Sequence, residues 1–474
     1  MIESIIDMQK VTLDNFRSFK NQEFNFSKVN ILIGENSGGK SSFLKFLLAL
    51  KQTVLNKNIN LKLYGDYVDL GNFHEVIYQN KTDEKLSFSF EFGKEYSDFY
   101  FHFIAGLVPN IEEEQKKIFL DDVRRYIGEC TLHHTAVKFV LDKNLEKHES
   151  IKIEFSNKIL GTLIIEHHEQ LKIDNIDLNV LIAENPKCNL KYTSPEKEYF
   201  LEDIEFHPDT FMSRVLSNSL RKHCIDKHND IGLFYKIAYF LVLQNHLTAS
   251  LQKIRFINPI HSSPARFYTL RDETSYIHLN IERFINILVK SFDANGRNNI
   301  LKLINDTLNN FGLADELDIR IDDKFSIAEL RVRIKDLWSN ITDVGYGVSL
   351  QLSIILQTML SEFAGGEILL IEQPEVHLHP KLQASFIDTL LKIGPRNTYF
   401  IETHSESIIR KLQSIVKNKT HSNITKDDIS IHYFRREKEK FTVNTHLINE
   451  NGKLSPNLPS GFFDSSYLLA KELM

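Results

Sequence analysis

The stretch VNILIGENSGGKSS, residues 29–42, joins an apolar run to a turn that is rich in glycine and serine and contains one lysine. The apolar run has the length and composition of a buried β-strand. The residues that follow, SSFLKFLLALKQTVL at 41–55, show helical spacing of Phe and Leu and contain no helix breaker. The turn is therefore predicted to lie between a strand and a helix.

The turn has the Walker A spacing, in which a glycine is followed after four residues by Gly-Lys-Ser. Glycines let the backbone curl so that its N–H groups point at phosphate oxygens, and the positive end of the following helix adds to this attraction. In this pattern Lys40 reaches the β- and γ-phosphates and the Ser41 hydroxyl ligates Mg²⁺. A flexible Gly/Ser loop is the alternative, which the flanking strand and helix disfavour. The predicted ligands of ATP are Gly34, Asn36, Ser37, Gly38, Gly39, Lys40, Ser41 and Ser42.

A second candidate lies in ILLIEQPEVHLHP, residues 368–380, where Glu372 directly follows four apolar residues. A charge at the end of a buried strand is costly unless it is used. Glu372 is therefore predicted to be the Walker B carboxylate that holds Mg²⁺ together with Ser41, and a solvent-facing acid is the alternative.

A histidine follows the next predicted strand, in TYFIETHSE at 398–406. His404 could polarise a γ-phosphate or a water molecule, although a satisfied surface histidine is also compatible with the pattern. Strands that alternate with helices in this part of the chain predict an α/β fold with a parallel sheet, and ligands bind such sheets at the carboxyl ends of the strands.

Composition sets outer limits on these predictions. The 474 residues are enough for about three domains at ~150 residues each. A net charge of −6 argues against a generally basic nucleic-acid binder but leaves room for a local basic groove. Three cysteines without metal or redox spacing favour a reducing, cytoplasmic setting. We expect no export signal, because MIESIIDMQK at the N-terminus has neither a basic nor an apolar region of that kind. We expect no membrane span, because no apolar run approaches ~20 residues.

The middle of the chain predicts less. Alternating patterns indicate strands from about 85 to 175, interrupted by a helical stretch at 111–129. The pattern becomes helical from about 196 to 254 and again in the blocks that end near residue 315, and strands return before residue 335. The predicted division is an N-terminal lobe with Walker A at 1–90, a mixed β and helical insertion at 91–330, a C-terminal lobe at 331–440 and a tail at 441–474.

Four segments in this order resemble a known group of proteins. LDNFRSFKNQEFNFSKVNILIGENSGGKSSFL resembles the opening of RecF-, SMC- and OLD-type ATP-binding-cassette ATPases. DVGYGVSLQL, LLIEQPEVHLHP and ETHSE resemble their signature, Walker B with D-loop, and switch histidine. INPIHSSPARFY and the tail LPSGFFD are similar to motifs of a bacterial AAA/OLD-like subgroup with a small C-terminal domain of unknown function. The resemblance covers residues 1 to about 80 and about 335 to 474, and the middle only at Pro259 to Tyr268. It implies an α/β P-loop head of the ABC type with a large insertion.

The resemblance also implies a homodimer or higher oligomer in which ATP is held between two copies. One copy offers the Walker motifs, and the other offers backbone amides at the helix start around Gly345 and Gly347. This segment departs from the usual Leu-Ser-Gly-Gly pattern, because Ser349 follows the glycines. Ser349 either contributes to the signature or caps the helix, and a plain Gly-Tyr-Gly turn is the alternative.

Another departure concerns hydrolysis. The resemblance implies a glutamate after the metal carboxylate, but this position is Gln373, which orients water without accepting its proton. Glu375 is the other candidate base. Because Gln373 stands where a glutamate is expected, we predict slow hydrolysis in which ATP acts mainly as a clamp. The catalytic candidates are Glu372, Gln373, Glu375 and His404. The segment Asn72 to Glu75 is either the γ-phosphate sensor of this group or a polar loop before a strand.

Partners are implied only by the resemblance. OLD proteins carry a nuclease domain after the switch histidine, but here about 70 residues follow His404, without the acidic cluster of a two-metal nuclease. The resemblance implies a separately encoded effector protein in anti-phage defence, for which a nuclease is one candidate. A RecF- or SMC-like ATPase that engages DNA in repair is the alternative, although basic patches are sparse and long heptad arms are absent. The insertion argues against a transporter subunit.

Overall fold

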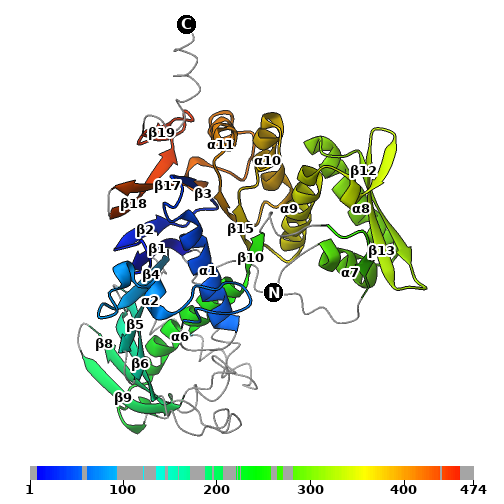
Figure 1. Ribbon diagram of the computed structural model, residues 1–474. Coiled ribbons are helices and arrows are strands. Elements are labelled where there is room, and N and C mark those ends of the chain that lie inside the picture. Colours follow the sequence, from blue (N-terminus) through cyan, green and yellow to red (C-terminus); the bar gives the residue numbers. More distant parts are fainter. Residues whose placement is uncertain are drawn as a thin grey trace. The chain divides into compact units, whose positions relative to one another are not determined.

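The computed structural model divides into two compact units (Figure 1). The first unit contains Ser27–Leu44 and the chain from Lys253 onward, and the second contains Ile6–Phe26 and Lys45–Gln252. The structure describes residues 8–55, 61–92, 121, 135–144, 148–157, 160–170, 187–194, 197–205, 220, 223–224, 226–257, 264–270, 281–437 and 440–459.

A seven-stranded sheet forms the centre of the first unit. Its five leading strands are parallel, and the last two continue the sheet antiparallel. In spatial order the strands are β10 (Ile254–Ile257), β15 (Ile368–Glu372), β16 (Thr398–Glu402), β3 (Val29–Gly34), β17 (Ile429–Glu437), β18 (Lys440–Ile448) and β19 (Leu454–Ser455). This spatial order differs from the order along the chain. The Walker A strand β3 comes first among these strands in the sequence but lies in the middle of the sheet, and β16 separates it from β15.

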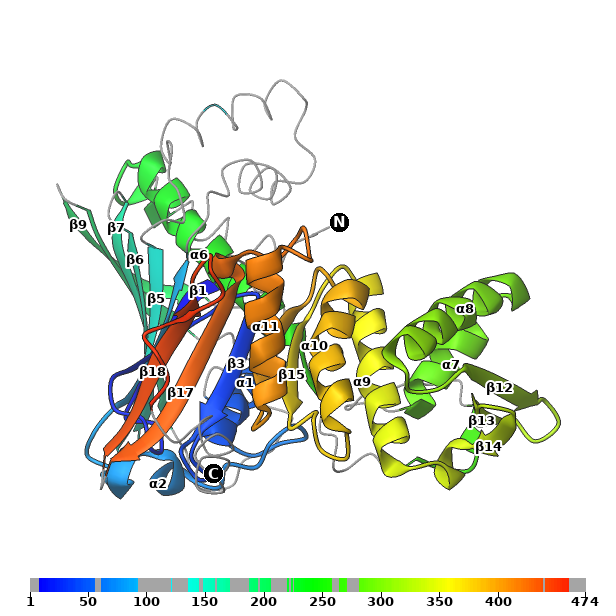
Figure 2. The same cartoon turned by 90° about the horizontal axis from the view of Figure 1, so that it is seen from above.

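Apolar runs explain the central strands. All six residues of β3 are buried, and β15 buries the four residues before its final glutamate. Strands covered on both faces require such continuous runs, which is why parallel strands lack a polar alternation. The helices of this unit share one hydrophobic core with the sheet, and α10 (Pro380–Ile393) lies between α9 (Tyr346–Phe363) and α11 (Glu406–Asn418) in both views (Figure 2).

A smaller antiparallel sheet belongs to the same unit. Its strands are β11 (Tyr268–Thr269), β13 (Ile327–Ile334), β12 (Glu316–Asp322) and β14 (Leu337–Asn340), with β13 paired to the other three. The helices α7 (Ile281–Ser291) and α8 (Ala294–Phe311) precede β12 in the chain. Asp293 caps the start of α8 by accepting a hydrogen bond from the Gly296 N–H, and Gly312 ends the helix in the left-handed conformation.

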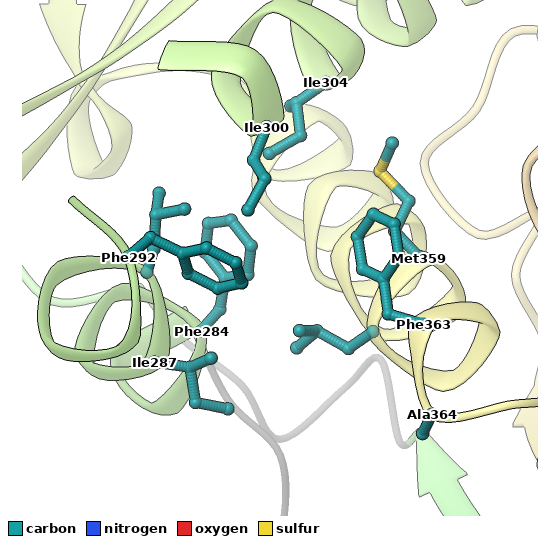
Figure 3. Close-up of a pocket in the computed structure, with 10 residues that line it drawn as sticks. Phe284, Ile287, Phe292, Ile300, Ile304, Met359, Phe363 and Ala364 are labelled. Atoms are coloured by element: carbon teal, nitrogen blue, oxygen red, sulfur yellow. The ribbon is translucent and has the colours of Figure 1, made fainter. Parts of the chain in front are cut away.

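An apolar cavity of about 240 Å³ lies among α7, α8 and α9 (Figure 3). Figure 3 shows the side chains of Phe284, Ile304, Met359 and Phe363 around it. Every described residue that lines the cavity is apolar, so these residues offer no partner to the phosphates predicted for the Walker motifs.

The second unit contains an antiparallel eight-stranded sheet and the helices α2 (Phe73–Val76) and α6 (Ile231–Gln252). Edge-to-face contacts of Phe16 with Phe46, and of Phe46 with Phe88, contribute to its core. In spatial order the strands are β2 (Gln22–Asn25), β1 (Met8–Asp14), β4 (Leu86–Phe92), β5 (Thr135–Asn144), β6 (His148–Asn157), β7 (Gly161–Gln170), β8 (Lys187–Thr193) and β9 (Glu198–Glu205).

Several sequence predictions are confirmed. A helix follows the Walker A turn as α1 (Lys40–Leu55), and strands fill most of the described positions between 85 and 175.

The helical prediction from about 196 was wrong at its start, because β9 pairs with β8 and buries Tyr199 and Leu201 on alternate positions. The predicted helix at 111–129 lies outside the described residues apart from Asp121. The four-part domain division stays a prediction.

No described helix combines the length and the apolar character that crossing a bilayer would require.

The start of α9 packs against the loop after β15 so closely that a side chain at Gly347 has no room. A Cβ atom there would lie 2.7 Å from the His377 carbonyl oxygen, whereas a Cβ at Gly345 would meet nothing within 4 Å. We expect Gly347→Ala to lower the free energy of unfolding by about 1–3 kcal/mol through overpacking, despite the better helix propensity of alanine. Urea unfolding followed by circular dichroism measures this change.

Gly345→Ala is the matched control, for which we expect a loss below about 1 kcal/mol because only a poorer N-cap is introduced. A Gly347→Ala protein as stable as this control would show that the close approach does not constrain the segment.

Candidate functional site

The Walker A turn is a tight loop between β3 and α1. The backbone takes positive φ angles of 132° at Gly34, 60° at Ser37 and 106° at Gly39. At Gly34 an added Cβ would overlap the Phe434 carbonyl group of the neighbouring strand β17, so only glycine fits there. The Gly38 N–H donates to the Glu35 carbonyl over 3.1 Å, which closes the loop on itself. A curled backbone of this kind directs successive N–H groups toward one point, as an anion site needs.

Lys40 is the first residue of α1 and its side chain is buried in the loop. The residue is 4% exposed, and its ammonium group donates to the carbonyl oxygens of Gly34 at 3.1 Å and Glu35 at 2.9 Å. Burial lowers the pKa of Lys40, and the negative charge of Glu402 opposes this shift. An ammonium group has three N–H donors, and the described residues provide no third acceptor. A phosphate oxygen would satisfy both the donor and the charge.

The Ser41 hydroxyl, next along the helix, donates to the carboxylate of Glu402, at 2.9 Å from Oε2 and 3.2 Å from Oε1. Glu402 ends β16 and is 5% exposed. Sequence reasoning missed this residue, although TYFIE repeats the pattern of apolar residues followed by glutamate that singled out Glu372 in ILLIE.

The predicted Walker B residue, Glu372, ends the neighbouring strand β15 and is half-buried. It pairs in parallel register with Glu402, and β16 separates its strand from β3. The strand ends therefore bring two carboxylates to the edge of the sheet where the Walker A helix begins, with Glu402 in direct contact with Ser41. The role of Glu372 in metal binding stays a prediction.

Hydrogen bonds join the loop after β15 to the end of β16 and the loop that follows it. Gln373 has a positive φ of 43°, and its N–H donates to the Glu402 carbonyl oxygen at 2.7 Å. Glu375 Oε1 accepts a hydrogen bond from the His404 N–H at 2.7 Å. Glu375 Oε2 is buried and has no hydrogen-bond partner among the described residues. A buried carboxylate oxygen of this kind is costly, so a water molecule or a ligand would be stabilising beside it.

The charges of Lys40 and Glu375 both act on the side chain of His404. Burial and the Lys40 ammonium lower the pKa of His404 from its usual 6.5, and Glu375 opposes the shift. The lowered pKa favours the neutral imidazole, which carries one N–H donor and one acceptor.

The predicted signature residues lie at the start of α9. Gly345 is the N-cap and provides no side-chain cap, and its carbonyl accepts from the Val348 N–H at 2.9 Å. The prediction that Ser349 could cap the helix was wrong, because Ser349 is the fourth residue inside α9 and is 1% exposed. Gln351 donates from Nε2 to the Pro374 carbonyl at 2.6 Å and so links α9 to the loop that carries Gln373 and Glu375.

The segment Asn72 to Glu75 lies in the second unit, where it forms a capping box at the start of α2. The Asn72 side chain accepts from the Glu75 N–H at 3.2 Å, and the Glu75 carboxylate accepts from the Asn72 N–H at 2.8 Å. Both polar groups have local partners, and a role in sensing the γ-phosphate stays a prediction.

The site fits ATP with Mg²⁺. Among the described residues, no three His, Cys, Asp or Glu side chains lie close enough together to hold a metal ion on their own. Mg²⁺ does not need such a cluster beside a nucleotide, because it binds through phosphates, waters and one or two carboxylates. The Ser41 hydroxyl and the Glu402 carboxylate provide oxygen atoms for the ion, and the buried Lys40 ammonium provides a donor for the phosphates.

Residues 8–409 match the model of the AAA ATPase domain family. The chain belongs to this family. The match confirms the predicted α/β P-loop fold and shows that the Walker A turn of this AAA ATPase is part of an ATPase domain. Residues 424–473 match a second family, described as a protein of unknown function (DUF3696). That match includes the tail LPSGFFD, of which residues 460–464 lie outside the described residues. No curated protein matches the chain.

Solved structures similar to this AAA ATPase include three SMC head domains. An SMC head bound to the C-terminal winged-helix domain of ScpA has a TM-score of 0.41 and 11% identity, over 93% of this chain and 98% of that one. The head from Thermotoga maritima has a TM-score of 0.33 and 9% identity, over 93% and 98%. A Pyrococcus furiosus head with an extended coiled coil, bound to the C-terminal domain of ScpA, has 0.34 and 9%, over 98% and 99%. These TM-scores are low, so the classification rests on the family match.

Lys40 and Glu375 shift the pKa of His404 in opposite directions, which gives a test of the site geometry. We expect Lys40→Met to raise the pKa of His404, because a repelling cation is removed. The value should stay below 6.5, since burial is the largest cause of the shift. Histidine side-chain NMR titration measures it, with the His404 signal identified by its loss in a His404→Gln protein.

Glu375→Gln is the opposing control and should lower the same pKa further, because it removes an attracting anion. Titration curves that move in neither protein would show that the three groups do not interact.

Proposed function

We propose that the chain binds ATP with Mg²⁺ at the Walker A loop, closes over it as a dimer and hydrolyses it slowly. The observation that carries this proposal is the buried Lys40 ammonium between two loop carbonyls, next to a serine hydroxyl that a buried carboxylate holds in place. This arrangement stands at the carboxyl ends of parallel strands, where α/β proteins bind ligands. The ATPase family of the chain supports the same assignment.

The residues of the loop would each have a distinct task. Lys40 would turn its third donor to the β- and γ-phosphates, and the amides from Asn36 to Ser42 would bind the remaining oxygens. Mg²⁺ would neutralise developing negative charge on the phosphates. Ser41 would ligate the ion, Glu372 would orient water around it, and the neutral His404 would donate to the γ-phosphate.

Hydrolysis would be slow because the residue after Glu372 is Gln373. A glutamine side chain orients a water molecule but accepts no proton from it. Glu375 is the better candidate for a general base, because its unpartnered Oε2 provides a place for the attacking water next to His404. The Gln373 N–H donates to the Glu402 carbonyl. This hydrogen bond holds the loop after β15, which carries Glu375, against the end of β16.

The partner of the site would be a second copy of the chain. The N-terminus of α9 at Gly345 and Gly347 has amides without intrahelical acceptors, which suit a γ-phosphate held by the facing copy. ATP would then act as a clamp, and its slow hydrolysis would set how long a separately encoded effector protein is restrained in anti-phage defence. A nuclease is one candidate for this effector. A reducing cytoplasm agrees with the buried free thiol of Cys224. DNA binding, the alternative, gains no support from the net charge of −6.

Single-turnover hydrolysis separates the two candidate bases. We expect Glu375→Gln to lower the rate by about 10²–10⁴-fold, the usual range for loss of a general base. Gln373→Glu should raise the rate, because it adds a proton acceptor where the resemblance implies one. Both rates are measured with radiolabelled ATP and excess protein.

ATP binding measured in the same preparations is the control, since neither substitution removes a group that contacts the phosphates. A Glu375→Gln protein that hydrolyses ATP at the parent rate would exclude Glu375 as the base.

A further inference from the structure

We propose that Glu402 is a positioning residue for Mg²⁺ in this site and acts by orienting the Ser41 hydroxyl toward the metal. The inference rests on the proposed function and deepens it, because it names a residue that the Walker motifs do not contain. Glu402 ends β16, whereas the Walker B strand is β15.

The direction of the Ser41 hydrogen bond carries the inference. A serine hydroxyl has one proton to donate and two lone pairs. The Ser41 proton points at Glu402, at 2.9 Å and 3.2 Å from the two carboxylate oxygens. The lone pairs therefore point away from Glu402, and lone pairs are what a cation needs. If the same hydroxyl turned its proton toward the loop, it could donate to a phosphate but could not ligate Mg²⁺.

Burial and charge make this orientation stable. Glu402 is 5% exposed, and a buried carboxylate is costly without donors or a nearby positive charge. Ser41 provides a donor, and the Lys40 ammonium provides a nearby positive charge, so that Glu402 opposes the lowering of the Lys40 pKa by burial. Arrival of Mg²⁺ would add further positive charge near a carboxyl group that is already held in place.

The backbone around Glu402 holds the carboxylate at one position. Its carbonyl accepts from the Gln373 N–H at 2.7 Å, and the Thr403 N–H donates to the Leu32 carbonyl of β3 at 3.1 Å. Strand β16 is also paired on both sides, with β15 and with β3. Groups that orient a metal ligand in this way typically change metal affinity by 10–100-fold when they are removed.

Glu402 differs from Glu372 in how it would act. Glu372 lies one strand farther from the Walker A strand and would act on the water shell of Mg²⁺. Glu402 touches the serine itself. The two roles predict different behaviour when Ser41 is absent, since a residue that acts through Ser41 has no effect without it.

The experiment measures equilibrium binding of ATP with Mg²⁺ and with EDTA, and compares the ratio of the two dissociation constants. The proteins are the parent, Glu402→Ala, Glu402→Gln, Ser41→Ala and the double variant Ser41→Ala/Glu402→Ala. We expect Glu402→Ala to lose about tenfold or more of the Mg²⁺-dependent gain, with binding in EDTA unchanged or tighter because a negative charge has been removed. Glu402→Gln keeps an acceptor for the Ser41 proton and should keep most of the gain.

In the Ser41→Ala background, adding Glu402→Ala should change the ratio no further. The inference is overturned if Glu402→Ala keeps the parent ratio, if Glu402→Gln loses as much as Glu402→Ala, or if the two losses add in the double variant. If Glu402→Ala does not fold, Glu402→Met takes its place, because methionine fills a similar volume without accepting a hydrogen bond. A parent protein that binds no ATP would overturn the proposed function itself, which is a separate outcome.

Discussion

A buried positive charge is the constraint on which the site depends. The Lys40 ammonium is enclosed by the carbonyl oxygens of Gly34 and Glu35, and a buried charge of this kind is costly without compensation. The compensation is partial in the structure, because the pKa of Lys40 is still lowered by burial although Glu402 opposes the shift. An anionic ligand would complete it. The tight turn at Gly34, the absence of a side chain there and the position of Glu402 all serve to hold this charge where a phosphate can meet it.

Strand order explains how the other groups reach Lys40. Because β16 lies between β15 and β3, the two loops that follow β15 and β16 meet the Walker A turn at one edge of the sheet. Hydrogen bonds of Gln373 with Glu402, and of His404 with Glu375, join these loops. Gln351 extends the connection to α9 through Pro374. These hydrogen bonds connect the carboxyl ends of β15 and β16 to the helix whose N-terminus is proposed to face a second copy.

The sequence was informative where a local pattern determines structure. The apolar run and glycine turn around Lys40, and the apolar strand that ends at Glu372, follow from residues adjacent in the chain. Glu402 was missed because its contact with Ser41 depends on which strand lies next to β3, and 361 positions separate the two residues. Ser349 was misjudged because the helix begins at Tyr346, so Gly345 occupies the cap. Strand β9 was missed because its pairing with β8, and not its own composition, decides its conformation.

Isothermal titration of MgATP into the parent protein and a Lys40→Ala protein tests whether the buried Lys40 ammonium binds the phosphates of ATP. We expect binding to the parent and at least about tenfold weaker binding to Lys40→Ala, since a hydrogen bond to a charged group contributes about 1.5–3 kcal/mol. Circular dichroism would establish that the variant is folded. A parent protein that releases no heat with MgATP, or a folded Lys40→Ala protein that binds equally well, would contradict this expectation.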